Sequence, residues 1–215
     1  MAVCGGNNVK RLFPAIKWLK ITVPIFQPEP AVLQKQIIYF WRKNQHMKKT
    51  LILVRHATAE DQNFRIRDFD RNLNSKGLSE SLAMGKWLVQ EGVKPDIFVS
   101  SPASRAFKTA EIIAGQYKVS IDAIQTQPGI YDGGPRAYLQ AVTSVAEQYS
   151  TIMLFGHNPD ITYFAEYLTG ASIGSMKKGS AAFIEFKDQK WGEISAKTGD
   201  LVLYKTPKQV REEEE

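Results

Sequence analysis

The stretch Thr50-Leu51-Ile52-Leu53-Val54-Arg55-His56-Ala57 decides the fold of this chain. Its apolar residues 51–54 favour a strand and do not alternate with polar residues. Such a run predicts a strand that is buried on both faces, as in a parallel sheet. The functional sites of open α/β sheets lie beyond the carboxyl ends of their strands. We therefore expect Arg55 and His56 to lie where this fold places its chemistry.

Two later segments repeat this pattern. The apolar run Ile97–Val99 is followed by Ser101, which we expect to cap a helix, and by Arg105 in the first turn of that helix. The apolar run Ile152–Phe155 is followed by Gly156 and His157. Parallel strands end at the same edge of a sheet, so four side chains are expected to converge there: Arg55, His56, Arg105 and His157.

The four residue types favour phosphoryl chemistry. The planar fork of an arginine matches two phosphate oxygens at once, and two arginines can hold a phosphoryl group between them. A histidine is a competent nucleophile because one ring nitrogen is unprotonated near neutral pH. We expect the second histidine to be protonated and to add hydrogen-bond donors. Any one of these residues could be a solvated side chain at the end of a strand, whereas all four together favour a phosphoryl site.

Three motifs resemble the signatures of the histidine phosphatase superfamily, which includes the phosphoglycerate mutases. They are L-V-R-H-A at residues 53–57, S-S-P-x-x-R-A-x-x-T-A at 100–110 and G-H-N-P at 156–159. The stretch Asp68–Gly77 is similar to a D-x-x-R-x-L-x-x-x-G segment of one subgroup. The short form without large insertions resembles the SixA-type phosphohistidine phosphatases. The resemblance implies that His56 is the nucleophile and that Arg55, Arg105 and His157 bind the phosphoryl group.

The general acid is less clear from the sequence. In the mutase-like relatives a glutamate after the second arginine protonates the leaving group, and Asp132 is the candidate in the comparable stretch here. Asp132 could instead favour a turn before Gly133. Asp68 and Glu60 are further candidates, and both could simply be solvated.

Strands alternate with helices along most of the chain, which predicts a three-layer α/β/α sandwich with a central, mostly parallel sheet. We expect a helix that Ser75 caps, one at 135–149, and one that Asn158 caps and that ends near Gly170. The segments Ala181–Phe186 and Leu201–Tyr204 are expected to be edge strands. The predicted organisation is a leader at 1–46, a catalytic domain at 47–208 and an acidic tail at 209–215, of which Glu212–Glu215 is expected to be frayed and solvated.

The charge of the chain is unevenly distributed. The 215 residues carry a net charge of +6, and residues 1–46 hold seven Lys and Arg against Glu29 alone. The remainder is therefore neutral, which argues against a nucleic-acid track. A single cysteine excludes an intramolecular disulfide framework. No histidine or carboxylate cluster has metal-ligand spacing, so we expect chemistry without a metal or cofactor.

The leader has two interpretations. Met47 directly precedes the first strand, so residues 1–46 are interpreted as an extension upstream of the natural start. Alternatively, residues 13–25 form a basic amphipathic segment that binds an acidic partner or membrane surface. The apolar runs of the leader are too short for a transmembrane helix, and a secretory pattern is missing, which predicts a cytoplasmic protein.

The sequence thus predicts a phosphatase for protein phosphohistidine. Only 52 positions separate Arg105 from His157, which leaves little chain for a lid over a small substrate. An imidazole also leaves more readily than a sugar alkoxide, so its departure needs less from a general acid. The alternatives are a small-molecule phosphomonoesterase and a phosphoprotein-binding module without activity. The presence of His56 favours an enzyme, because binding alone needs only the arginines.

Overall fold

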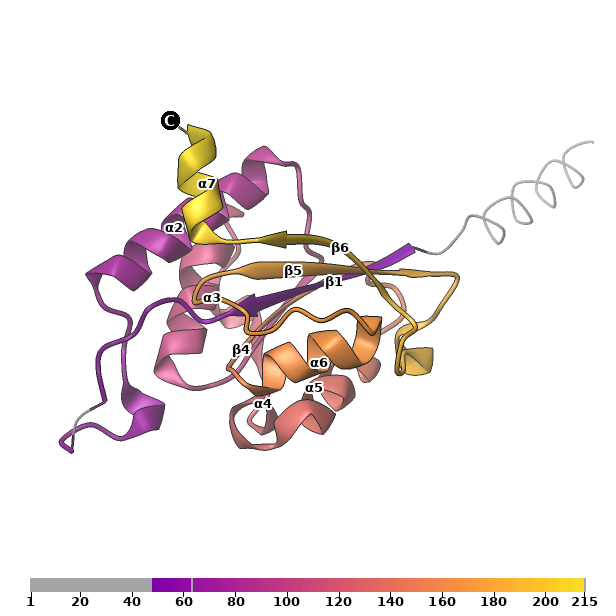
Figure 1. Cartoon of the computed structure of the whole chain (residues 1–215), viewed down its shortest axis with the longest axis horizontal. Coiled ribbons are helices and arrows are strands. Elements are labelled where there is room, and N and C mark those ends of the chain that lie inside the picture. Colours follow the sequence, from indigo (N-terminus) through magenta and orange to yellow (C-terminus); the bar gives the residue numbers. More distant parts are fainter. Residues whose placement is uncertain (1–47, 63, 215) are drawn as a thin grey trace, which may run out of the picture. The chain divides into compact units, whose positions relative to one another are not determined.

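Six strands form one mixed sheet in the computed structural model, which describes residues 48–62 and 64–214. The strand order is β3-β2-β4-β1-β5-β6, of which Figure 1 labels β4, β1, β5 and β6. The strands are β1 (Lys48–Arg55), β2 (Ile97–Ser100), β3 (Ile124–Thr126), β4 (Thr151–Gly156), β5 (Ala181–Lys187) and β6 (Asp200–Lys205). The strands β1, β2, β3 and β4 run parallel to one another. The strand β5 pairs antiparallel with β1 and with β6. The predicted fold class is confirmed.

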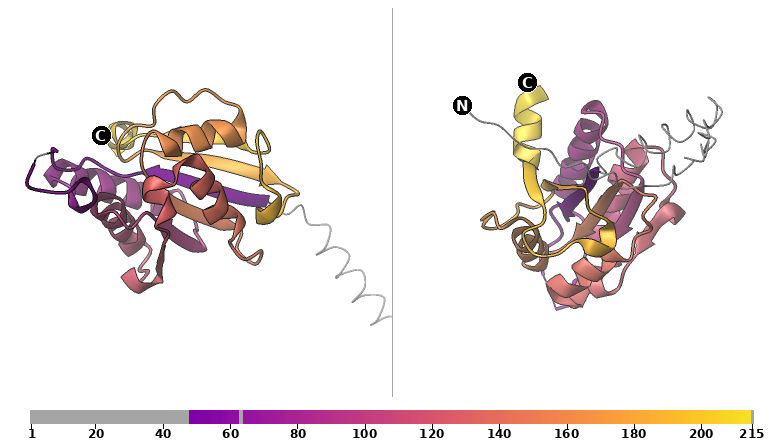
Figure 2. Two further views of the ribbon diagram at one scale, coloured as in Figure 1. Left: turned by 90° about the horizontal axis from the view of Figure 1, so that it is seen from below. Right: turned by 90° about the vertical axis from the view of Figure 1, so that its right-hand side faces the viewer.

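Helices cover both faces of the sheet (Figures 1 and 2). The α-helices are α2 (Ser75–Gln90), α3 (Ser104–Gln116), α4 (Gly129–Asp132), α5 (Gly134–Thr143), α6 (Asp160–Thr169) and α7 (Pro207–Glu214). Three short 3-10 helices are η1 (Asp68–Asp70), η2 (Ile121–Ala123) and η3 (Trp191–Glu193). None of the helices in the described part of the chain is long and apolar enough to cross a membrane.

The buried strand β1 divides the core into two halves. Leu51 and Leu53 belong to a cluster with apolar side chains of α5, α6 and η3. Ile52 and Val54 point to the opposite face, into a cluster with side chains of α2, α3 and α7. All four side chains are fully buried. The apolar run without alternation therefore arises because successive strand residues face two different helical layers.

Several helix starts and one helix end differ from the sequence prediction. The N-cap of α2 is Asn74 rather than Ser75, since the Asn74 side chain accepts a hydrogen bond from the Gly77 N–H at 3.0 Å. The helix α3 begins only at Ser104, and the expected cap Ser101 lies outside it. The helix expected at 135–149 ends at residue 143. The helix expected to start with Asn158 as its cap begins at Asp160 and ends, as predicted, at Gly170.

Two predictions about the end of the chain are wrong. Of the two strands expected at edges, β6 lies at an edge, whereas β5 is internal because it pairs with β1 as well as with β6. Residues 212–214, which were expected to be frayed, belong to the helix α7, and Val210 of the acidic tail is fully buried against the layer that contains α2. Lys205 forms an ion pair with Glu213 and lies over the Trp87 ring at 5.0 Å. The predictions for residues 1–46 lie outside the described residues.

The packing of α7 can be tested by Val210→Ala. This change removes two buried carbon atoms, at about 0.8 kcal/mol each, and leaves a small cavity. We expect the free energy of unfolding, measured with urea, to fall by about 1–2 kcal/mol. The control Lys208→Ala alters an exposed residue of α7 whose ion pair with Glu212 spans 3.5 Å. It should change the free energy of unfolding by less than about 0.5 kcal/mol. Equal values for the two variants would support the frayed tail instead.

Candidate functional site

Three adjacent parallel strands end at the candidate site. The strand β4 lies between β1 and β2, and Arg55 pairs in register with Gly156. The His56 N–H donates to the Gly156 carbonyl at 3.0 Å, and the Ser101 N–H donates to the Phe155 carbonyl at 3.0 Å. Arg105 follows in the first turn of α3. The structure therefore brings together the four side chains that the sequence predicted to converge.

His56 has a defined tautomer. Its Nδ1 lies 2.8 Å from the Ala57 carbonyl oxygen, which can only accept, so Nδ1 carries the hydrogen. The lone pair is then on Nε2, toward which Arg105 Nε donates over 3.4 Å. Burial, and then the charges of Arg105, Arg55 and Lys178, lower the pKa of His56 to about 3. His56 is therefore a neutral imidazole at pH 7, and its unprotonated Nε2 faces Arg105.

His157 lies beside His56, with ring centroids 5.1 Å apart. Its Nε2 is 2.8 Å from the Ser101 hydroxyl, whereas its Nδ1 is buried and has no hydrogen-bond partner among the described residues. Burial, followed by the influence of His56 and of Arg105, lowers the pKa of His157 to about 3. The expectation of a protonated His157 is thus not met in this structure. A phosphate dianion would raise this pKa, because an opposite charge favours the charged form.

The backbone at His157 depends on close packing against α5. The His157 N–H donates to the Tyr138 hydroxyl at 2.8 Å. The same hydroxyl would lie 2.1 Å from a Cβ atom at position 156. A glycine therefore precedes His157 because a side chain there would displace Tyr138.

Arg55 is held by the segment before β5. Its Nη1 donates to the Met176 carbonyl at 2.6 Å, and the Gly179 N–H donates to the Arg55 carbonyl at 3.1 Å. Arg55 Nε is buried without a hydrogen-bond partner among the described residues. Arg55 also lines a cavity of about 410 Å³ with Asn158 and Tyr163. A buried polar group without a partner is costly, so the unpaired Arg55 Nε and His157 Nδ1 favour an anionic ligand here.

The carboxylate that reaches the site is Asp68. It accepts from Arg105 Nη2 at 2.9 Å and from the Tyr131 hydroxyl at 3.2 Å. Burial raises the pKa of Asp68, but hydrogen bonds and charges from Arg71 and Arg105 outweigh burial and lower it to about 2. Asp68 is therefore ionised at neutral pH.

The other candidate acids lie elsewhere. Asp132 is exposed at the end of α4 and forms no hydrogen bond or ion pair with the described residues. The neighbouring Tyr131 points into the site instead, with its ring edge-on to His157 at 5.7 Å. The Glu60 carboxylate accepts from the Asn72 N–H at 3.2 Å. The catalytic role of Asp132 remains a prediction.

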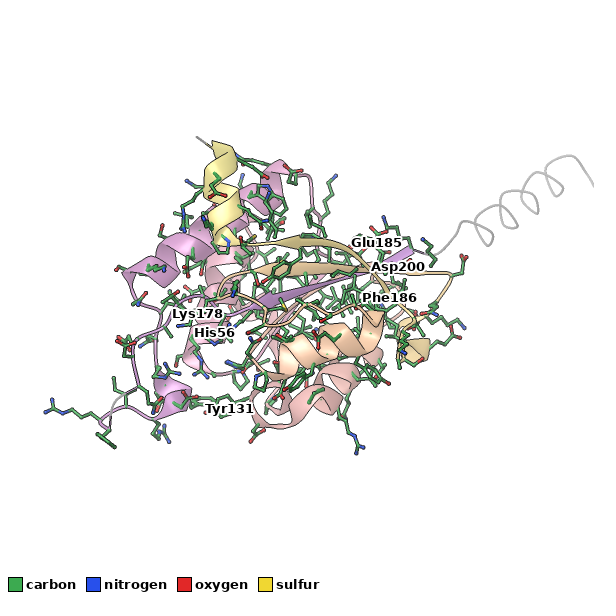
Figure 3. The ribbon with its side chains drawn as sticks, in the orientation of Figure 1. His56, Tyr131, Lys178, Glu185, Phe186 and Asp200 are labelled. Carbon is green, nitrogen blue, oxygen red and sulfur yellow. The ribbon has the colours of Figure 1, made fainter. Side chains whose placement is uncertain are left out.

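Sequence reasoning missed Tyr131, Lys178 and the contact of Ser101 with His157. Lys178 lies close to His56 (Figure 3) and contributes to its lowered pKa. Tyr131 directly precedes the candidate acid Asp132, but a tyrosine gives no sequence signal for a role at a phosphoryl site. Lys178 precedes a turn at Gly179, where a lysine is ordinary. Within residues 48–62 and 64–214, no group of three or more His, Cys, Asp or Glu is placed to hold a metal ion.

Comparisons with known proteins agree with this geometry. A sequence profile of the Histidine phosphatase superfamily (branch 1) matches residues 51–130. An uncharacterized chloroplastic protein of Arabidopsis thaliana is 30% identical over 161 residues, which cover 71% of this chain and 73% of that protein.

Two solved structures share the fold. One, described as a phosphohistidine phosphatase SixA of Agrobacterium tumefaciens, has a TM-score of 0.64 and 22% identity, over 74% of this chain and 98% of its own. The other, described as a SixA phosphatase of Nakamurella multipartitia, has a TM-score of 0.59 and 25% identity, over 74% of this chain and 96% of its own.

The two buried histidines predict a specific pH dependence of stability. Their pKa is about 3 when folded and 6.5 when exposed, so the unfolded chain binds more protons between these values. Stability is then complete above about pH 6.5 and falls as the pH approaches 3, by about 2 kcal/mol per histidine at pH 5. We expect the double variant His56→Asn, His157→Asn to lose less stability than wild type between pH 7.5 and 5 in urea unfolding. An equal loss in both proteins would contradict the lowered pKa values.

Proposed function

This chain belongs to branch 1 of the histidine phosphatase superfamily, and on that basis we propose that it is a phosphatase that forms a phosphohistidine on His56. The observation that carries the proposal is the state of His56. Its Nδ1–H is fixed by the Ala57 carbonyl, its unprotonated Nε2 carries a lone pair directed toward Arg105 Nε, and burial keeps the ring neutral. A neutral imidazole with an oriented lone pair is ready for nucleophilic attack without a separate base.

The reaction has two displacements. His56 Nε2 attacks phosphorus, the new P–N bond forms as the bond to the leaving group breaks, and the leaving group departs with that electron pair and takes up a proton from solvent. Water then attacks phosphorus and releases one proton to solvent, the P–N bond breaks, its electron pair returns to Nε2, and inorganic phosphate departs. Arg55 Nε, Arg105 and His157 Nδ1 are the groups that would bind the phosphoryl oxygens, since charge builds up on these oxygens during transfer.

We propose protein phosphohistidine as the substrate. Asp68 is ionised near neutral pH and has no proton to give. Asp132 is exposed and forms no hydrogen bond with either histidine. A leaving group that departs without strong acid assistance suits this site, and a histidine imidazole is such a group. Chemistry without a metal, and a cytoplasmic location, remain predictions, although the Arabidopsis relative is named as chloroplastic.

The substrate can be tested by comparing a phosphohistidine protein with sugar phosphates and a phosphoserine peptide. We expect kcat/KM for the phosphohistidine protein to be at least ~10-fold higher, which corresponds to about 1.4 kcal/mol in the barrier. Faster hydrolysis of sugar phosphates would favour a small-molecule phosphomonoesterase. Tight binding of the phosphoprotein without turnover would favour a binding module.

The nucleophile can be tested by His56→Ala. We expect turnover to fall by more than ~1000-fold, because alanine has no nitrogen to form the covalent intermediate. The melting temperature at pH 7.5 should change little, since His56 directly follows β1 and belongs to neither apolar cluster of the core. Brief mixing of wild type with substrate and an alkaline quench should trap an acid-labile phosphoryl group on His56. A variant that kept near wild-type rates would contradict this mechanism.

A further inference from the structure

Arg105 has two of its nitrogens engaged by one residue. Its Nη1 donates to the Asp68 backbone carbonyl at 2.6 Å, and its Nη2 donates to the Asp68 carboxylate at 2.9 Å. Its third nitrogen, Nε, faces His56 Nε2 at 3.4 Å. A guanidinium is planar and rigid, so fixing the Nη1 and Nη2 end also fixes the direction of Nε. Asp68 thus determines which edge of Arg105 faces the nucleophile.

Asp68 is itself held from two further directions. Arg71 donates to Asp68 Oδ1 from Nε at 3.0 Å and from Nη2 at 2.6 Å. The Tyr131 hydroxyl donates to Oδ2 at 3.2 Å. Arg71 is anchored in turn by the Glu60 carbonyl, to which its Nη1 donates at 2.7 Å. The Arg105 side chain is only 7% exposed, so its orientation is set by these contacts rather than by solvent.

We propose that Asp68 is a positioning residue that aims the Nε edge of Arg105 at the phosphoryl group on His56. This inference rests on the proposed function and adds to it a residue that need not touch the substrate. Two other roles are less consistent with the contacts. A general acid needs a proton, and Asp68 is ionised with both carboxylate oxygens already accepting hydrogen bonds. A competitor of phosphate would cover the reactive edge, whereas Asp68 binds the opposite end of Arg105.

The variant Asp68→Asn removes the charge and keeps the size. We expect the Kd for vanadate, measured by isothermal titration calorimetry, to rise about 10-fold, the effect of weakening one charge-assisted hydrogen bond. We also expect kcat/KM to fall by about the same factor for an aryl phosphate and an alkyl phosphate, because orientation of Arg105 does not depend on the leaving group. Asp68→Glu, which restores the charge, should recover part of the loss.

The matched control is Asp70→Asn. Asp70 lies in the same 3-10 helix and pairs with Arg67 at 2.7 Å rather than with Arg105, so vanadate binding and turnover should stay at wild-type values. Tyr131→Phe removes one hydrogen bond to Asp68 without changing charge, and should weaken vanadate binding by a smaller factor. It tests the same network if Asp68→Asn does not fold.

Three outcomes would overturn the inference. Tighter vanadate binding by Asp68→Asn would make Asp68 a competitor of phosphate. A loss confined to the alkyl phosphate would make it a general acid. Unchanged vanadate binding in both Asp68→Asn and Tyr131→Phe would leave it no positioning role. Vanadate binding does not require turnover, so wild type that bound vanadate but hydrolysed nothing would contradict the proposed function alone.

Discussion

The strand β4 is hydrogen-bonded in parallel to β1 on one side and to β2 on the other, and the site depends on this arrangement. Parallel neighbours end at one edge of a sheet, and here the ends are in register at Arg55 and Gly156. A shift by one residue would turn every following side chain to the opposite face. Burial on both faces disfavours such a shift, because the apolar residues of the shifted strand would then face the wrong layer of helices.

This arrangement concentrates positive charge in a buried place. Arg55 and Arg105 approach two histidines that are each less than 8% exposed. Burial and the two cations favour neutral imidazoles, which is the state that a nucleophile requires. Asp68 offsets part of the charge through Arg105 and Arg71, but Arg55 Nε stays without a partner among the described residues. The electrostatics therefore favour an incoming anion and a neutral nucleophile at the same time.

The helical layers on the two sides contribute differently to the site. On one side, α5 supplies Tyr138, whose hydroxyl receives the His157 N–H, and α4 supplies Tyr131. On the other side, α3 supplies Arg105 and also Thr109, whose hydroxyl accepts the Ala57 N–H at 3.1 Å. Each face thus fixes the backbone next to one of the two histidines. The spacing of the two rings follows from packing on both faces of the sheet.

The sequence by itself determined the strands, the burial of β1 on both faces, and the four side chains that follow three of the strands. These features are local, since an apolar run and the residue that follows it can be recognised within about ten positions. It did not determine where α3 begins or that the end of the chain forms the helix α7. There the contact of Ser101 with His157 and the burial of Val210 outweigh local preference. Only the tertiary structure decided that Tyr131 rather than Asp132 faces His157, and that Asp68 binds Arg105. Tyr131 and Asp68 are 63 positions apart, and their contact depends on how separate segments pack, which no local pattern encodes.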